Sequence, residues 1–152
     1  MTIYFFVILA VCVLDQLTKV WALDFLSEVS SKTVIDGVLD FTFVKNDGMA
    51  FGLLGDHRWV FMVLSTVGIL AMLAYLIYLK GNGKLFCFSL SLVIGGGIGN
   101  MFDRVALGYV VDFIDVTLFG KYWTWVFNVA DSAICIGAVL LMLAVILEEK
   151  KK

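Results

Sequence analysis

Proline is absent from this sequence of 152 residues, whereas about 5% is typical of proteins. Its absence excludes proline kinks from any helix that the chain forms. Cysteine is scarce and odd in number: Cys12, Cys87 and Cys135 lie within long apolar runs, and no Cys-x-x-Cys pair occurs. The cysteines therefore predict neither a disulfide framework nor a metal site, and we expect them to be packing residues.

Basic clusters and the common hydrolytic motifs are also missing. The formal net charge is only −2, and the lack of a basic patch argues against a nucleic-acid partner. The sequence has no His-Glu-x-x-His zinc motif and no Ser–His or Cys–His pair in a motif context. The single histidine, His57, stands at the boundary of an apolar run, which favours an interfacial position over a role as catalytic base. These residues imply no metal ion and no cofactor.

Apolar residues, in contrast, are in excess. They make up 62% of the chain, against about 45–50% in a soluble domain, and the mean hydropathy is +1.01. Four apolar runs are long enough to cross a membrane core about 30 Å thick, at about residues 3–23, 59–79, 85–102 and 126–147. The first run has no basic residue before it and no cleavage site after it, so it is predicted to be an uncleaved span. We predict an integral membrane protein with one domain, residues 1–152.

Lysines predict the orientation of the spans. Lys80 and Lys84 flank the link between the second and third runs, and Lys150, Lys151 and Lys152 end the chain. The positive-inside rule therefore places this link and both termini in the cytoplasm. Residues 24–58, and the segment from Arg104 to Trp125, are then expected to face outward.

The outer loop 24–58 carries strand and turn signals. Asp36-Gly37 is a two-residue hairpin signal, and apolar and polar residues alternate from Leu39 to Val44, as in a half-buried strand. Asn46-Asp47-Gly48 predicts a turn, and Met49 to Leu54 a short interfacial segment. The predicted fold class is an all-α membrane protein of four transmembrane helices, with a small extracytoplasmic β-sheet and loop subdomain and with both termini cytoplasmic.

Polar residues of three spans fall at one predicted depth. At about 1.5 Å of rise per residue, Asp15 lies roughly 20 Å from the cytoplasmic ends, Asn100 roughly 24 Å and Asp131 roughly 25 Å. Lys19 follows Asp15 at i+4, where the two can pair, either as a structural ion pair or as part of a site. This shared depth predicts a polar site in the outer leaflet.

Two carboxylates stand among apolar and aromatic neighbours near this layer, in Tyr109-Val-Val-Asp112-Phe-Ile and in Phe127-Asn128-Val-Ala-Asp131-Ser. An unpaired carboxylate costs on the order of 2.5–3.5 kcal/mol at the centre of a membrane helix, so its presence indicates a function. Two carboxylates in low dielectric do not both ionise readily, and the pair then shares a proton and can activate water. Asn128, one turn before Asp131, is placed to orient its carboxylate.

The third run ends with polar residues at i, i+3 and i+4: Asn100, Asp103 and Arg104. Asp103 and Arg104 can form a salt bridge at the end of the helix. Together with the two later aspartates, the three residues instead favour a shell that orients the site. Before them, Gly95 and Gly99 form a small-xxx-small pair that allows another backbone to approach closely.

Five sequence blocks carry a resemblance to a known family. They are Asp15-Gln-Leu-Thr-Lys19, Asn46-Asp-Gly-Met-Ala-Phe51, Gly95 to Arg104, Val110-Val-Asp-Phe113 and Phe127-Asn-Val-Ala-Asp131. Each block is weak alone, but their order on four spans is specific. The chain resembles lipoprotein signal peptidase, or signal peptidase II, over nearly its whole length.

The resemblance implies an aspartic endopeptidase of the bacterial inner membrane, with its active site toward the outer leaflet. Its substrate would be a prolipoprotein whose cysteine carries diacylglycerol, cut just before that cysteine, and globomycin-type inhibitors and membrane lipid would be further partners. Asp112 and Asp131 match the catalytic pair of the family. The supporting residues would be Asp15, Lys19, Asn46, Gly48, Asn100, Asp103, Arg104 and Asn128.

Two other function classes compete with this interpretation. A small ion- or proton-coupled transporter would also carry intramembrane aspartate and lysine, but it predicts polar residues throughout the bilayer depth and internal repeats. This chain shows one polar layer and no visible repeat. A membrane scaffold without activity leaves the buried carboxylates unexplained.

Overall fold

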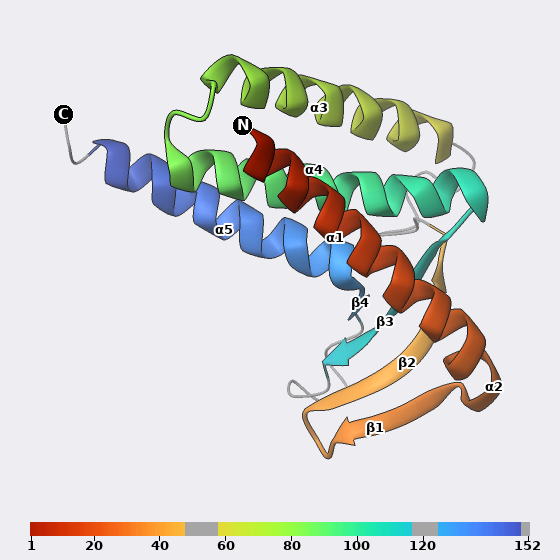
Figure 1. The fold of residues 1–152 in the computed structure, drawn as a ribbon. Helices are drawn as coiled ribbons and strands as arrows, with labels where there is room; N and C mark the ends of the chain where they lie inside the picture. Colours follow the sequence, from red (N-terminus) through yellow and green to blue (C-terminus); the bar gives the residue numbers. More distant parts are fainter. Residues whose placement is uncertain (48–57, 117–124, 150–152) are drawn as a thin grey trace.

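Four long helices and a small antiparallel sheet make up the fold in a computed structural model that describes residues 1–47, 58–116 and 125–149 (Figure 1). The helices are α1 (Thr2–Trp21), which continues through the π-helical turn η1 (Ala22–Leu26) into α2 (Ser27–Val29), α3 (Arg58–Leu79), α4 (Lys84–Ala106) and α5 (Val129–Glu149). The strands are β1 (Ser31–Ile35), β2 (Leu39–Asn46), β3 (Val110–Val116) and β4 (Val126–Phe127).

The four predicted spans are helices long and apolar enough to cross a membrane. Two predicted boundaries are wrong. The third helix continues beyond residue 102 to Ala106, because the charge of Asp103 is paired with Lys19 and does not force the helix out of the protein interior. The fourth helix begins at Val129 and not at residue 126, because Val126 and Phe127 pair with β3 instead.

Helix α4 lies at the centre of the helical layer and packs against α1, α3 and α5. Three glycines on α4 allow this close approach. A Cβ atom on Gly95 would lie 2.9 Å from Val11 Cβ on α1, and one on Gly96 would collide with the backbone carbonyl of Ala130 on α5. The predicted small-residue pair, Gly95 and Gly99, therefore faces the first helix.

The sheet has the order β1-β2-β3-β4, with every neighbouring pair antiparallel. The predicted hairpin between β1 and β2 is present, but its turn spans three residues, Asp36–Val38, because the register shifts between Thr33 and Ile35. Gly37 adopts φ +67° in this turn, a conformation that glycine reaches at little cost. The strand predicted from Leu39 to Val44 extends to Asn46.

The sheet is attached to the C-terminal end of α1 by aromatic side chains. Trp21 packs edge to face against Phe41 and Phe113, with ring centroids 5.3 and 6.0 Å apart. Beneath these rings, a core cluster of Ala22, Leu26, Val111 and Phe113 joins η1 to β3. The position of β3 is therefore fixed relative to the helices.

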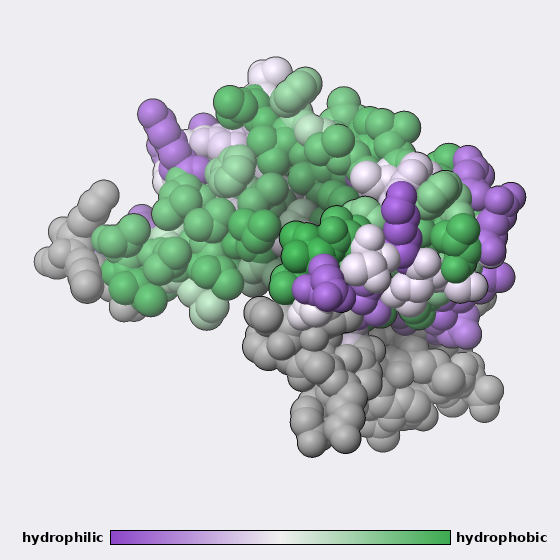
Figure 2. All heavy atoms as spheres, turned by 90° about the horizontal axis from the view of Figure 1, so that it is seen from below, coloured by the Kyte–Doolittle hydropathy of each residue, from purple (hydrophilic) through white to green (hydrophobic). Residues whose placement is uncertain are grey.

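Apolar side chains cover the long helices, whereas hydrophilic residues gather toward the two ends of the helical layer and on the sheet (Figure 2). This distribution is the one expected of a protein that crosses a membrane. The N-terminus and the described end of α5 lie on the side away from the sheet. Of the cysteines, Cys87 packs in the core, Cys12 is partly buried and Cys135 is exposed on α5, so the expectation of packing does not hold for Cys135; all three thiols are free.

Candidate active site

Strand β3 carries Asp112 into the interior, at a point where its neighbours are apolar. Val110, Val111 and Phe113 are buried, and Asp112 itself is only 1% exposed. One carboxylate oxygen accepts a hydrogen bond of 2.8 Å from Asn46 Nδ2 on β2, and the other accepts one of 2.6 Å from Asn128 Nδ2. Asp112 is thus buried with two neutral amide donors.

Asp131 occupies the first turn of α5, where it closes a capping box with Asn128. The backbone N–H of Asp131 donates to Asn128 Oδ1 at 2.8 Å, and the backbone N–H of Asn128 donates to Asp131 Oδ2 at 3.3 Å. This reciprocal pattern satisfies two backbone donors at the start of a helix. It explains why α5 begins just after Asn128, and it places Asp131 on the side of the helix end that faces β3.

Asn128 connects the two aspartates. Its side-chain oxygen is used by the cap of α5, so its amide nitrogen points the other way and donates to Asp112 Oδ1. The same nitrogen lies 3.0 Å from Asn100 Oδ1 and 3.3 Å from the carbonyl oxygen of Val111. The side chain is fully buried. One residue therefore sets the relative position of the two carboxylates.

Asn100 on α4 extends the network toward α1. Its Nδ2 donates to Asp131 Oδ1 at 2.7 Å, and its Oδ1 accepts a hydrogen bond from Lys19 Nζ at 2.9 Å. Lys19 is 2% exposed and also pairs with Asp15 at 2.8 Å and with Asp103 at 3.0 Å. A buried ammonium ion that has three oxygen partners is fully satisfied. The cation does not contact either Asp112 or Asp131.

Asp15 and Asp103 fix the backbone around the site. Asp15 Oδ1 accepts from the backbone N–H of Ala130 at 2.9 Å, so it caps the start of α5 from a different helix. Asp103 Oδ2 accepts from the backbone N–H of Val111 at 3.0 Å, which anchors β3 just before Asp112. Both carboxylates therefore position the backbone segments that carry the candidate catalytic residues.

Gln16 was given no role from the sequence, although it belongs to the first of the five sequence blocks, Asp15 to Lys19. Gln16 Nε2 donates to Asp103 Oδ1 at 2.9 Å and lies 3.3 Å from Asp15 Oδ2. It thus supplies a further donor to the two carboxylates that flank Lys19. Its position next to Asp15, as a polar residue within a predicted span, could have indicated this role.

The structure brings together most of the predicted site residues: Asp15, Lys19, Asn46, Asn100, Asp103, Asp112, Asn128 and Asp131. The predicted pair of Asp15 and Lys19 is confirmed. Arg104 forms no salt bridge within the described ranges, and its Nη1 donates to the backbone oxygen of Asn100 at 3.3 Å. Gly48, His57 and the predicted segment from Met49 to Leu54 lie outside the described residues.

The electrostatics of Asp112 differ from those of an ordinary aspartate. The pKa of its carboxyl group is raised from 3.8 to about 6, chiefly because burial penalises the charged form. The carboxylate of Asp131 also raises this pKa, whereas the hydrogen bonds from Asn46 and Asn128 lower it. Such a group can hold a proton near neutral pH, as a general acid must.

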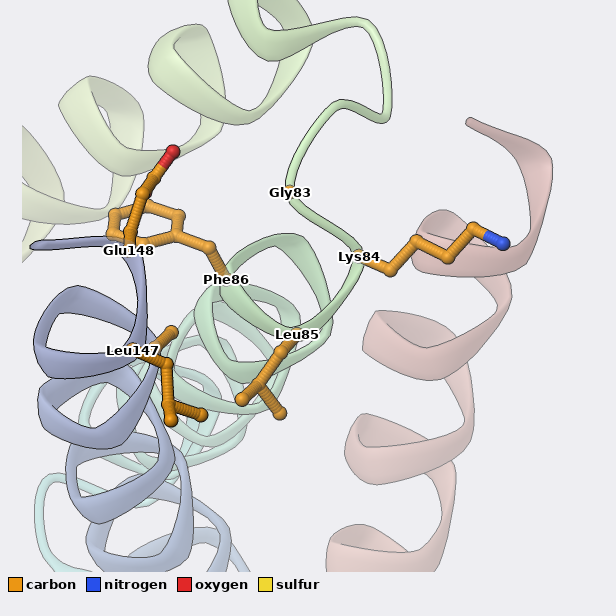
Figure 3. Close-up of a pocket in the computed structure, with 7 residues that line it drawn as sticks. Gly83, Lys84, Leu85, Phe86, Leu147 and Glu148 are labelled. Atoms are coloured by element: carbon orange, nitrogen blue, oxygen red, sulfur yellow. The ribbon is translucent and has the colours of Figure 1, made fainter. Parts of the chain in front are cut away.

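A pocket of about 340 Å³ lies at the other end of α4 and α5 (Figure 3), lined by Gly83, Lys84, Leu85, Phe86, Ala144, Leu147 and Glu148. Its polar side chains belong to Lys84 and Glu148, and the ammonium group of Lys84 points away from Glu148. Glu148 is the single carboxylate that lines this pocket, so the pocket has no pair of carboxyl groups that could hydrolyse a peptide bond. The candidate active site is therefore the cluster around Asn128.

Comparisons with known proteins identify a family for this chain. The family model described as signal peptidase (SPase) II matches residues 7–147. The chain belongs to the signal peptidase II family. A lipoprotein signal peptidase of Clostridioides difficile (strain 630) is 40% identical over 152 residues, with 98% of each chain covered. One of Pelodictyon phaeoclathratiforme is 44% identical over 151 residues, with 94% of this chain and 89% of the relative covered.

The fold is shared with a solved structure titled as a bacterial membrane enzyme at 1.9 Å resolution. The TM-score is 0.78 at 30% identity, and the match covers 95% of this chain and 93% of that one. The chain is accordingly a multi-pass membrane protein. Lipoprotein signal peptidases are aspartic hydrolases that remove signal peptides from prolipoproteins, so membership favours this activity over the ion-coupled transporter.

Proposed function

We propose that Asp112 and Asp131 are the catalytic pair of an aspartic endopeptidase that removes signal peptides from prolipoproteins. The observation that carries the proposal is the convergence of both carboxylates on the buried residue Asn128: Asp112 accepts from its side-chain nitrogen, and Asp131 accepts from its backbone N–H. They come from different elements, β3 and α5, and α5 brings its acid to the site in its first turn.

Peptide hydrolysis by such a pair uses one ionised and one protonated carboxyl group. The ionised carboxylate removes a proton from water, and the water oxygen attacks the carbonyl carbon, while the protonated carboxyl donates its proton to the carbonyl oxygen. In the second step the proton held by the first carboxylate passes to the amide nitrogen, and the carbon–nitrogen bond breaks. The second carboxyl regains its proton from the tetrahedral intermediate, so the pair is restored.

The neighbouring amides support this chemistry by position. The side-chain amides of Asn46 and Asn128 donate to Asp112, and that of Asn100 donates to Asp131. Asp15 and Asp103 hold the backbone of α5 and β3, and Lys19 pairs with both of these carboxylates. We assign these six residues to the support of the pair. Arg104 and Gly48 are assigned to substrate binding or support on the resemblance to the family.

The proposed substrate is a prolipoprotein whose cysteine carries diacylglycerol, cut immediately before that cysteine. We propose that the chain lies in the bacterial inner membrane as a single peptidase domain, with both termini in the cytoplasm and the sheet outside. The site then lies toward the outer leaflet, where the polar layer of α1, α4 and α5 meets the sheet. Membrane lipid and globomycin-type inhibitors are further proposed ligands.

Single-turnover cleavage tests the catalytic pair. Purified protein in detergent is mixed with diacylglyceryl-modified prolipoprotein, and the parent is compared with Asp112→Asn, Asp131→Asn and the double variant. Because the two acids act as one unit, each single variant should lose turnover by a factor of roughly 10³ or more, and the double variant should be no worse. Thermal melts in detergent show that the variants are folded. Substantial cleavage by a folded single variant would exclude this pair.

A further inference from the structure

The proposed chemistry requires one aspartate to be ionised and the other protonated, and the hydrogen bonds distinguish the two. Lys19 Nζ can only donate, so the oxygen of the Asn100 amide must face it, at 2.9 Å. The amide nitrogen of Asn100 is then turned toward Asp131 Oδ1, at 2.7 Å. A buried cation therefore fixes the orientation of the donor that Asp131 receives.

The second oxygen of Asp131 also faces a group that can only donate. Asp131 Oδ2 accepts from the backbone N–H of Asn128 at 3.3 Å, and a backbone N–H has no alternative role. Asp131 stands in the first turn of α5, where the helix dipole favours negative charge. Both of its oxygens thus meet fixed donors at the positive end of a helix, an environment that stabilises a carboxylate.

Asp112 lies in a different environment. It is on a strand, which has little net dipole, and it is 1% exposed. Within the described ranges, its two oxygens accept from the side-chain amides of Asn46 and Asn128. Burial raises its pKa to about 6, against the opposing effect of these two hydrogen bonds.

Charged residues from three elements surround the pair. They are Asp15 and Lys19 on α1, Asp103 and Arg104 on α4, and Lys45 on β2, which is directed over the ring of Tyr109. Lys19 is the buried cation of this set. It donates a hydrogen bond to Asn100, and Asn100 donates one to Asp131.

We infer that Asp131 is the ionised base, that Asp112 carries the proton, and that Lys19 is a positioning residue that enforces this division through Asn100. This inference rests on the proposed function. Asp131 removes the proton from water, and the hydroxyl of Asp112 donates to the carbonyl oxygen of the substrate.

Two isosteric substitutions each place a new charge beside one aspartate. Asn100→Asp adds a carboxylate next to Asp131, and Asn46→Asp adds one next to Asp112. The measurement is the pH dependence of kcat/KM for diacylglyceryl-modified prolipoprotein in detergent. The acidic limb of this pH profile reports the pKa of the base, and the basic limb reports that of the acid. Asn100→Asp should move the acidic limb upward by about one pH unit, whereas Asn46→Asp should move the basic limb upward. The opposite pattern would exchange the roles and overturn the inference.

Lys19 is tested by the pair Lys19→Gln and Lys19→Arg in the same assay. Lys19→Gln should move the acidic limb upward in the same direction as Asn100→Asp, and Lys19→Arg should restore it because the charge is retained. A purely structural lysine would lower the melting temperature without moving the limb, and that result would exclude the positioning role.

A second measurement does not depend on turnover. Carbon-13 NMR of the parent protein, labelled at the aspartate carboxyl carbons, follows both signals through a pH titration, each assigned by its loss in an Asp→Asn variant. At pH 5.5 the Asp112 signal should have the chemical shift of a protonated carboxyl and the Asp131 signal that of a carboxylate. The reverse result would overturn the inference alone, whereas cleavage by folded Asp→Asn variants would overturn the proposed function.

Discussion

At the scale of single residues, Asn128 determines the geometry of the site. Its oxygen caps α5 and its nitrogen holds Asp112, so the amide cannot turn around without breaking both contacts. An aspartate at this position would have no donor for Asp112, and an alanine would also lose a helix cap, which typically costs about 1 kcal/mol. The stability of the helix and the alignment of the two acids thus depend on one side chain.

The raised pKa of Asp112 predicts how stability depends on pH. The folded protein holds a proton on this group up to about pH 6, whereas the unfolded chain releases it near 3.8. The folded state therefore binds more protons between these values, and its stability falls as the pH rises through this window, by about 3 kcal/mol in total. Asp112→Asn removes this titration.

The measurement is the melting temperature in detergent, compared between Asp112→Asn and the parent at several values from pH 4.5 to 7. The variant should gain relative to the parent as the pH rises. Asp36→Asn, on an exposed turn residue, serves as the control. A constant difference between Asp112→Asn and parent across this range would show that the Asp112 carboxyl does not titrate as the structure indicates.

At the scale of elements, the close packing of α4 against α1 and α5 brings the polar residues together. Gly99 allows Asp15 to lie against α4, since a Cβ atom there would be 2.6 Å from Asp15 Oδ2. Gly96 allows the start of α5 to approach, with its candidate catalytic Asp131 one residue beyond Ala130. The glycines of α4 therefore place the capped end of α5 beside Lys19 and Asn100.

Substitution of these glycines should separate the elements. Gly96→Ala and Gly99→Ala should each lower the stability by about 1–3 kcal/mol, because the added methyl group meets backbone or a buried carboxylate. Gly68→Ala on α3 is the matched control, since its Cβ meets nothing within 4 Å, and it should be neutral or stabilising by up to about 1 kcal/mol. Thermal melts and cleavage rates are compared, and equal effects at all three positions would contradict the packing argument.

At the scale of the whole molecule, the sheet lies at one end of the helices, and the N-terminus and the described end of α5 lie away from it. With four spans, this arrangement allows one orientation that satisfies the lysines of the second link and the tail. The site lies where the helical layer meets the sheet.

Accessibility labelling tests the orientation. In a variant without Cys12, Cys87 and Cys135, an exposed cysteine is introduced either at Thr33 in β1 or at Asn82 in the link between α3 and α4. A membrane-impermeant thiol reagent added to intact cells should label Thr33→Cys and not Asn82→Cys, and both should react after the cells are broken. Labelling of Asn82→Cys in intact cells would reverse the proposed topology.

The sequence by itself determined the four spans and the residues of the site, because burial in a membrane makes apolar length and isolated carboxylates easy to detect. Asp112 and Asp131 were predicted from the cost of a carboxylate among apolar neighbours, and Asp15 and Asn100 from the depth that they share with Asp131. The pair of Asp15 and Lys19 followed from helical spacing alone. Local sequence is sufficient for these features because each depends on residues within a few positions of one another.

Only the tertiary structure decided which partners these residues have. Lys19 pairs with Asp103 and bonds to Asn100, both more than eighty positions away, so Arg104 is not the partner of Asp103. The start of α5 was also misplaced, because Val126 and Phe127 pair with a strand. The direction of each amide depends on donors supplied by other elements, and those donors are brought within reach only when the helices pack. For this reason the division of roles between the two aspartates is absent from the sequence pattern.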